Sequence, residues 1–357
     1  MKLMISALIL FCAVLTFVYW LTPSQPLLKQ AATEGYIDMH VHVGCMGVSD
    51  NDCFVSPSIK DSYKFGFYLK AFDTDEAELQ REGDEIIVAK LDANIAASVW
   101  VDKAVVLAMD GLINSEGSVD RENTQIYIPN EYVVKAIAGY DNLLFGASIN
   151  PNRRDALQQL EQAKANGAVL IKWIPCIMGI EPDSPSMVPF YRKLIELELP
   201  LLTHAGQERS FAHSRDELCD PQKLVTALEL GVTVIAAHIA TTGENAGVDN
   251  FKRILAMFAR YPNLYTDISS LTQINKLGYL TTALQREALV ERMIYGSDWP
   301  LQMFPIVSPW YHAGSISFRE ARTIESLNNK WDRDVTLKKA LGVPEAVFRR
   351  SRELLLL

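Results

Sequence analysis

The sequence lacks the features that mark several common classes of protein. Acidic residues outnumber basic ones, the formal charge is -9, and basic doublets such as Arg153-Arg154 and Arg349-Arg350 stand alone without interleaved aromatic residues. This pattern argues against a nucleic-acid partner. No glycine fingerprint for a dinucleotide follows the first predicted strand, and no cysteines have the C-x-x-C spacing of a zinc knuckle. With 49% apolar and 22% charged residues, the composition is that of a globular protein.

Charged residues are absent from Leu3 to Leu21, directly after Lys2. A helix of this length is just long enough to cross the hydrocarbon core of a membrane, and it exceeds the usual apolar core of a cleaved signal peptide. We therefore predict a transmembrane signal anchor over residues 1–21 and a linker over residues 22–35, with a cleaved signal peptide as the alternative. The rest of the chain would then lie outside the cytoplasm, in the periplasm or extracellular space, or be secreted after cleavage.

Five cysteines are present, and Cys12 lies in the apolar segment. Outside the cytoplasm Cys45 and Cys53 could form a disulfide, whereas two free thiols are the alternative. The sequence does not decide between these states.

Short apolar runs alternate with helical patterns from residue 36 onward, which predicts an α/β protein. The stretch from residue 45 to 81 is too long for a plain turn, so we expect it to cover a site. Lys172, His204, His238, Asp267 and Asp298 end successive runs at intervals of 32, 34, 29 and 31 residues. Such even spacing, near the roughly 30 residues of one βαβ step, favours a (β/α)8 TIM barrel over residues 36–317, with C-terminal helices over 318–357 packed outside. The predicted strands cover residues 36–43, 103–109, 143–149, 168–173, 200–204, 232–238, 263–269 and 293–298.

Side chains that bind metals gather at the predicted strand ends. Side chains two apart in a strand share a face, so Asp38, His40 and His42 point the same way in the first strand. His204 and His238 end two later strands, and Asp298 ends the last. Because the carboxyl ends of barrel strands meet at one mouth, these groups should converge. Burying them together is costly without a cation, and imidazoles with a carboxylate suit Zn²⁺.

The combination of these motifs resembles the amidohydrolase superfamily, and more narrowly its amidohydrolase-related branch with the aminocarboxymuconate semialdehyde decarboxylase-like enzymes. The resemblance implies one divalent metal ion, commonly zinc, held by His40, His42, His204 and Asp298. It also implies that His238 and Asp298 are catalytic. The matching segments are Asp38-x-His40-x-His42, Thr203-His204-Ala205-Gly206, Ala237-His238 and Tyr295-Gly296-Ser297-Asp298-Trp299-Pro300.

The role of Lys172 differs between the single-metal and two-metal forms of such a site. In two-metal members of the superfamily, the lysine of the fourth strand is carboxylated and bridges both ions; otherwise Lys172 would contact a substrate anion or a neighbouring carboxylate. We expect the single-metal form, because the Tyr-Gly-Ser-Asp-Trp-Pro ending and the short context of the fourth strand are more similar to the single-metal branch. Arg153 and Arg209 follow strand ends and are weaker candidates for substrate binding, with ordinary salt bridges as the alternative.

The leading functional hypothesis is a metal-dependent hydrolase that uses a metal-activated water on an amide, ester or lactone of a small molecule. The alternative on the same scaffold is a non-oxidative decarboxylase, a lyase that acts on a small carboxylic acid. A third hypothesis is a membrane-tethered barrel that binds a metal or ligand without turnover. The sequence allows an oligomer but does not specify one.

Overall fold

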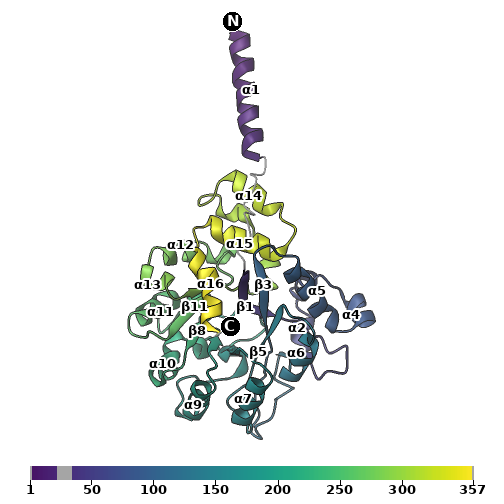
Figure 1. The fold of residues 1–357 in the computed structure, drawn as a ribbon, viewed down its shortest axis with the longest axis vertical. Helices are drawn as coiled ribbons and strands as arrows, with labels where there is room; N and C mark the ends of the chain where they lie inside the picture. Colours follow the sequence, from purple (N-terminus) through teal and green to yellow (C-terminus); the bar gives the residue numbers. More distant parts are fainter. Residues whose placement is uncertain (1, 22–33, 356–357) are drawn as a thin grey trace.

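The computed structural model describes residues 2–21 and 34–355, and its centre is a parallel eight-stranded barrel (Figure 1). Each strand pairs with the next in chain order, and backbone hydrogen bonds close the ring: His42 donates to Trp299 O at 2.9 Å, and Asp298 donates to His40 O at 2.9 Å. The strands are β1 (Tyr36–His42), β3 (Val101–Leu107), β5 (Leu143–Ala147), β6 (Leu170–Trp173), β7 (Leu201–Thr203), β8 (Val234–Ala236), β11 (Leu264–Asp267) and β12 (Met293–Ile294).

The predicted (β/α)8 barrel is confirmed, and all eight predicted strands occur in their predicted order. Several strands end earlier than predicted, because the polar residue that follows leaves the extended conformation. His238, for example, has a φ of 57° two residues after the end of β8. The apolar pattern therefore extends beyond the hydrogen-bonded strand into the turn that carries the functional side chain.

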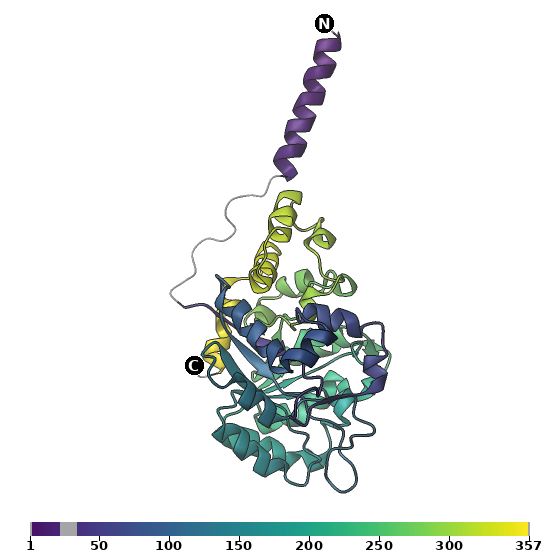
Figure 2. The same cartoon turned by 90° about the vertical axis from the view of Figure 1, so that its right-hand side faces the viewer.

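Helices follow the strands and surround the barrel (Figures 1 and 2). In α11, Asp249 caps the amino terminus by accepting a hydrogen bond from Lys252 N, and Phe251, Ile254 and Phe258 are buried at helical spacing. The segment before β12 forms two short helices, α12 and α13, since Arg286 adopts an extended conformation between them. The helices are α5 (Glu85–Ala96), α6 (Asn130–Ile137), α7 (Ala156–Ala165), α8 (Pro175–Met178), α9 (Val188–Glu196), α10 (Val225–Leu230), α11 (Asn250–Phe258), α12 (Tyr279–Leu284) and α13 (Glu287–Val290).

Residues 45–82 form a cap of short elements over the mouth of the barrel, as expected from the length of this stretch. The Asp84 carboxylate accepts hydrogen bonds from the backbone of Met46 and Val48, and a Cys45–Cys53 disulfide closes the first loop. The cap contains β2 (Phe54–Val55), α2 (Pro57–Lys60), α3 (Phe65–Ala71) and α4 (Glu76–Glu82). Its strand β2 pairs with β4 (Ile126–Tyr127), and a second small hairpin joins β9 (Glu244–Asn245) to β10 (Val248–Asp249).

Three helices end the described chain: α14 (Phe318–Glu325), α15 (Lys330–Ala340) and α16 (Glu345–Leu354). Helix α16 packs against β1 and β12, and α14 packs against α15. The indole of Trp331 donates to the Asp38 carboxylate at 2.7 Å. The buried ammonium of Lys338 donates to Gly296 O at 2.8 Å and to Asp334 at 2.7 Å. These contacts hold the strand ends from outside the barrel.

The helix α1 (Lys2–Leu21) stands apart from the barrel, on the side where α14 lies (Figures 1 and 2). Within the described part of the chain, no helix is both long enough and apolar enough to span a membrane. The predicted anchor therefore has no support from the structure. The predicted linker over residues 22–35 lies almost entirely outside the described residues.

The buried pair of Lys338 and Asp334 leads to a prediction about stability. Lys338→Met leaves the Asp334 carboxylate buried without its cation, so the free energy of unfolding should fall by about 3–5 kcal/mol. Lys339→Met is the matched control, because its ion pair with Glu345 is half-exposed and should contribute about 1 kcal/mol or less. Urea unfolding measures both variants, and equal losses would contradict the special role of the buried pair.

Candidate active site

A single cavity opens at the carboxyl ends of the barrel strands, beneath the cap. Its base holds every metal-ligand and catalytic candidate predicted from the sequence, and also Lys172. Its walls come from the cap, from the loop after β7 and from the loop after β11. The predicted residues in this lining are His40, His42, Lys172, His204, His238 and Asp298.

Three polar atoms of His40, His42 and Asp298 converge at the centre of the base. The two Nε2 atoms are 3.2 Å apart, and Asp298 Oδ1 lies 3.5 Å from His40 Nε2 and 3.3 Å from His42 Nε2. His40 Nδ1 donates to the Asp267 carboxylate at 2.7 Å, so the lone pair of the neutral ring is on Nε2. A lone pair and a carboxylate oxygen held this close repel each other unless a proton or cation lies between them. This donor set therefore fits a divalent cation.

His238 presents a second ring nitrogen to the same space. Its Nδ1 lies 2.7 Å from Ser269 Oγ and 3.1 Å from Ser269 O, and a carbonyl oxygen only accepts. The proton is therefore on Nδ1, and Nε2 of the neutral ring carries a lone pair, 3.9 Å from Asp298 Oδ2. His40 and His238 also form a possible ligand set with Asp267. Ser270 Oγ donates to the Asp298 carboxylate.

His238 and Asp298 both adopt left-handed backbone conformations, with φ of 57° and 64°. Such conformations are costly for residues other than glycine and occur often at functional sites. Backbone hydrogen bonds hold both residues: His238 N donates to Asp267 Oδ1 and Asp298 N donates to His40 O, each at 2.9 Å. The turn conformation thus aims each side chain into the cavity.

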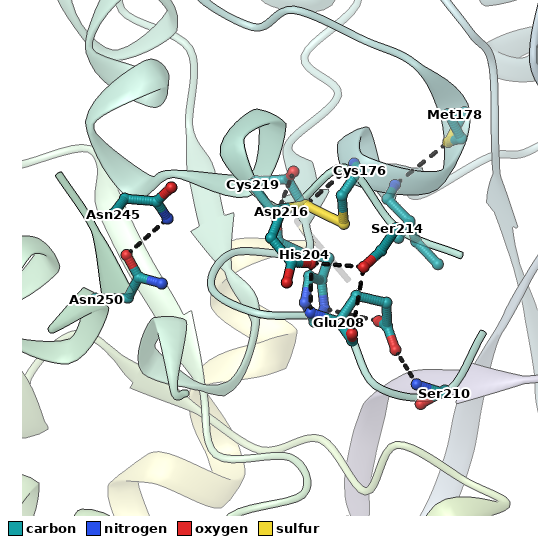
Figure 3. Close-up of a disulfide and its surroundings, with 12 residues drawn as sticks. Cys176, Met178, His204, Glu208, Ser210, Ser214, Asp216, Cys219, Asn245 and Asn250 are labelled. Atoms are coloured by element: carbon teal, nitrogen blue, oxygen red, sulfur yellow. Dashed lines mark hydrogen bonds and ion pairs between the residues drawn. A yellow bond between two sulfur atoms is a disulfide. The ribbon is translucent and has the colours of Figure 1, made fainter. Parts of the chain in front are cut away.

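His204 lies at the end of β7, against a loop closed by the Cys176–Cys219 disulfide (Figure 3). Its Nδ1 is 3.5 Å from Glu208 Oε2, whereas its Nε2 is buried and has no hydrogen-bond partner among the described residues. A buried ring nitrogen without a partner is a suitable ligand atom. The two cysteines and His204 could also group around a cation, but in this structure the sulfurs are bonded to each other.

Burial keeps these imidazoles neutral, which metal binding requires. Burial, together with the charge of Lys172, lowers the pKa of His40 to about 4. Burial likewise lowers the pKa of His204 and lowers that of His238 well below its ordinary value. Burial would raise the pKa of Asp298, but the imidazoles of His238 and His40 outweigh this effect and hold it well below its usual range.

Lys172 also lies at the base of the cavity, and its Nζ is 2.9 Å from His40 Nε2. Burial lowers the pKa of this ammonium to about 8, although carboxylates such as Asp267 oppose the shift. At neutral pH Lys172 is therefore mostly charged and donates to the lone pair that a metal ion would use. An ion on His40 requires that Lys172 move away or be modified.

Two buried aspartates support the site from behind. Asp267 accepts from His40 Nδ1 and from His238 N, so it orients two rings. Asp38, in contrast, contacts no ring of the site; it accepts from Ser297 N at 2.9 Å and from Trp331 Nε1. Its role is to hold the chain that leads to Asp298.

The weaker substrate-binding candidates differ in position. Arg153 is not in the cavity lining, since its guanidinium forms a bidentate pair with Asp110 at 2.6 Å. The ion pair is the alternative that the sequence left open for Arg153, and substrate binding by this residue stays a prediction. Arg209 does line the cavity, and its Nη2 donates to Gln207 Oε1 at 2.7 Å.

Several features of the site were missed at the sequence level. The Cys176–Cys219 disulfide joins residues 43 apart with no motif spacing. Ser269, Ser270 and Lys276 come from the loop after β11, and their position just past a strand end was the available signal. The strand-end residues predicted to act in the site are His, Asp and Arg side chains together with Lys172, and none of them lies in this loop.

Comparisons with known proteins identify the family. The sequence model of the amidohydrolase family matches residues 37–323, whereas no curated protein matches the chain. The fold is similar to that of an uncharacterized TIM-barrel protein from Bordetella bronchiseptica (TM-score 0.55, 15% identity, covering 90% of this chain and 98% of that chain). It is also similar to that of a protein assigned as a 2-pyrone-4,6-dicarboxylic acid hydrolase from Pseudomonas putida (TM-score 0.50, 17% identity, covering 90% and 97%). A 5-carboxyvanillate decarboxylase from Novosphingobium aromaticivorans, complexed with manganese, is 13% identical with a TM-score of 0.48, covering 94% and 99%. The family match confirms the resemblance seen in the sequence: the chain belongs to the amidohydrolase family.

Proposed function

We propose that the chain is a metal-dependent hydrolase that acts on an amide, ester or lactone of a small molecule. The observation that carries this proposal is the convergence of possible ligand atoms from His40, His42 and Asp298, with His204 and His238 in the same cavity lining. Neutral imidazoles gathered around a carboxylate in this way form a donor set that suits a divalent cation.

His40, His42, His204 and Asp298 would hold the ion, and nitrogen and oxygen ligands of this kind suit zinc. When bound, a divalent ion lowers the pKa of water and polarises a carbonyl or carboxylate. We propose one ion per chain, with Lys172 remaining an ammonium displaced from His40. A second ion would require Lys172 as a carboxylated bridge.

The chain's own groups would handle the proton. Asp298 Oδ1 faces the histidine pair, where it would accept a proton from the attacking water, while Ser270 holds the carboxylate in place. His238 presents Nε2 with its lone pair, because Ser269 fixes the proton on Nδ1. After taking up a proton at Nε2, His238 would donate to the oxygen that becomes negative or to the leaving group.

Decarboxylation of a small acid is the second candidate function. The ammonium groups of Lys172 and Lys276 line the same cavity and would attract a carboxylate. An arginine directed at the ligand set would favour this chemistry further. Arg209, however, is the arginine that the described residues contribute to the lining, and it is hydrogen-bonded to Gln207.

We also propose that the barrel lies outside the cytoplasm. The support is the pair of disulfides, Cys45–Cys53 and Cys176–Cys219, since such bonds persist in oxidising compartments. In intact cells or spheroplasts, added protease should therefore degrade the barrel. Protection of the whole barrel, with a periplasmic or surface marker degraded in the same sample, would show that this location is wrong.

Elemental analysis of the purified full chain tests the ligand set. We expect one equivalent of divalent metal, and its loss in Asp298→Ala, because the carboxylate is a ligand. Asp267→Asn should keep the ligands but loosen His40, lowering the affinity about 10- to 100-fold, as for other residues that orient metal ligands. Two equivalents would instead indicate a carboxylated Lys172. No metal in a folded chain would contradict the proposed function.

His238→Asn tests the proton-transfer role. The asparagine amide can still donate to Ser269 O, but the variant has no Nε2, so turnover should fall about 10²- to 10⁴-fold with the metal content unchanged. The assay is a panel of esters, lactones and amides, with release of carbon dioxide from carboxylic acids followed in parallel. Carbon dioxide release without hydrolysis would favour the lyase. Loss of metal in the variant would make His238 a ligand.

A further inference from the structure

Lys276 is a buried cation that the proposed reaction does not use. It ends the 3-10 turn η5 (Ile274–Lys276) in the loop after β11, it is 9% exposed, and it lines the same cavity as the histidines. Its backbone N–H donates to Gln273 O, but among the described residues no side chain or carbonyl forms a hydrogen bond or ion pair with its ammonium. The side chain is about nine-tenths buried and lines the cavity, and its ammonium has no partner among the described residues to offset this desolvation, so its position favours an anionic ligand.

The nearby carboxylates are already engaged. Asp267 accepts from His40 Nδ1 and from His238 N. Asp298 accepts from Ser270 and faces the histidine pair. Glu208, the third, accepts from Ser210 N and faces His204. These groups attract Lys276 through space and oppose the lowering of its pKa that burial causes, yet none binds it.

The charge of the base also favours an anion. The two ammonium groups of Lys172 and Lys276 stand against the carboxylates of Asp267, Asp298 and Glu208, all of them buried or nearly so. This leaves one negative charge among these groups, which a divalent ion would convert into one positive charge. A ligand with a single negative charge would make the base neutral.

Much of the remaining cavity lining is apolar. The cap and neighbouring loops supply aliphatic and aromatic side chains to it. A ligand that fills the space would therefore combine an anionic end with an apolar or aromatic body. The side chains include Ile59, Phe65, Tyr68, Phe72, Ile128 and Leu301.

We propose that Lys276 binds a carboxylate of the substrate, and that the substrate is a small monocarboxylic acid with an apolar or aromatic body. The bound carboxylate is not the reacting group: it anchors one end while the bond to be broken lies toward His238 and Asp298. The identity of the reaction rests on the proposed function, whereas the anion subsite at Lys276 does not. Lys276 is thus a residue that determines specificity.

Binding of benzoate and of nitrobenzene, its uncharged counterpart of similar shape, tests this subsite. Titration calorimetry is carried out on the purified full chain, with metal and after chelation, so that binding to the ion is separated from binding to Lys276. Lys276→Gln should weaken benzoate binding roughly 10- to 100-fold, the effect typical of a lost charged hydrogen bond, and leave nitrobenzene binding unchanged. Lys276→Arg should restore most of the affinity for benzoate. Lys60→Gln, at the exposed end of α2, is the control and should bind both compounds as the wild type does.

Equal benzoate affinity in the wild type and in Lys276→Gln would overturn the proposal, as would a benzoate affinity that depends on the ion alone. An equal loss of affinity for benzoate and for nitrobenzene would also overturn the proposal, because that result indicates a structural role for Lys276. If Lys276→Gln does not fold, Lys276→Met takes its place. The ratio of benzoate affinity to nitrobenzene affinity is also measured for the wild type, and a ratio near one refutes the subsite. Metal content and turnover are measured on the same samples. A benzoate effect of Lys276→Gln in a chain without metal or turnover supports the subsite and refutes the proposed function.

Discussion

One buried carboxylate, Asp267, fixes the geometry on which the site depends. It accepts a hydrogen bond from His40 Nδ1, from His238 N and from Ser269 Oγ, and so ties the ends of β1, β8 and β11 together. Because His40 donates from Nδ1, its Nε2 must face the cavity with a lone pair. Burial raises the cost of a free carboxylate here, and these donors offset that cost. Without Asp267, His40 would lose the group that fixes its orientation and its tautomer, and His238 would lose the hydrogen bond that holds its backbone.

The closure of the barrel depends on a second set of buried contacts, outside the cavity. Asp38 joins β1 to the segment that follows β12, and the C-terminal helix α15 contributes Trp331 to the same carboxylate. Gly296 is required between them, since a Cβ at this position would lie 3.0 Å from His40 Cβ. The helices after residue 317 therefore stabilise the placement of Asp298, although they contribute no group to the cavity lining.

Two regular features of the sequence predicted part of the site: the alternation of side chains along a strand and the even spacing between strand ends. Alternation along β1 placed His40 and His42 on one face, and the regular intervals between strand ends placed His204, His238 and Asp298 at one mouth. This reasoning could not predict the ion pair of Arg153 with Asp110, because Asp110 lies 43 residues earlier in an irregular loop. Lys276 was missed for a related physical reason: whether a loop lysine is buried depends on the packing of the cap, which has no periodic signal. Pairing of Cys176 with Cys219 likewise depends on how two loops meet.

Lys172 couples the charge of the site to its metal content. Its ammonium donates to His40 Nε2, the atom that the ion also requires, so a proton-bearing lysine and a metal ion compete for one lone pair. Burial lowers the pKa of Lys172 to about 8, which makes the neutral amine accessible just above neutral pH. A neutral lysine neither repels a cation nor holds the lone pair as strongly, and it is also the form that reacts with carbon dioxide. The same buried lysine thus permits a single-ion site while charged and displaced, and a two-ion site only after it has been converted into an anion. In the proposed function, the chemical state of Lys172 would therefore decide the number of ions, because the arrangement of the histidines would serve either form.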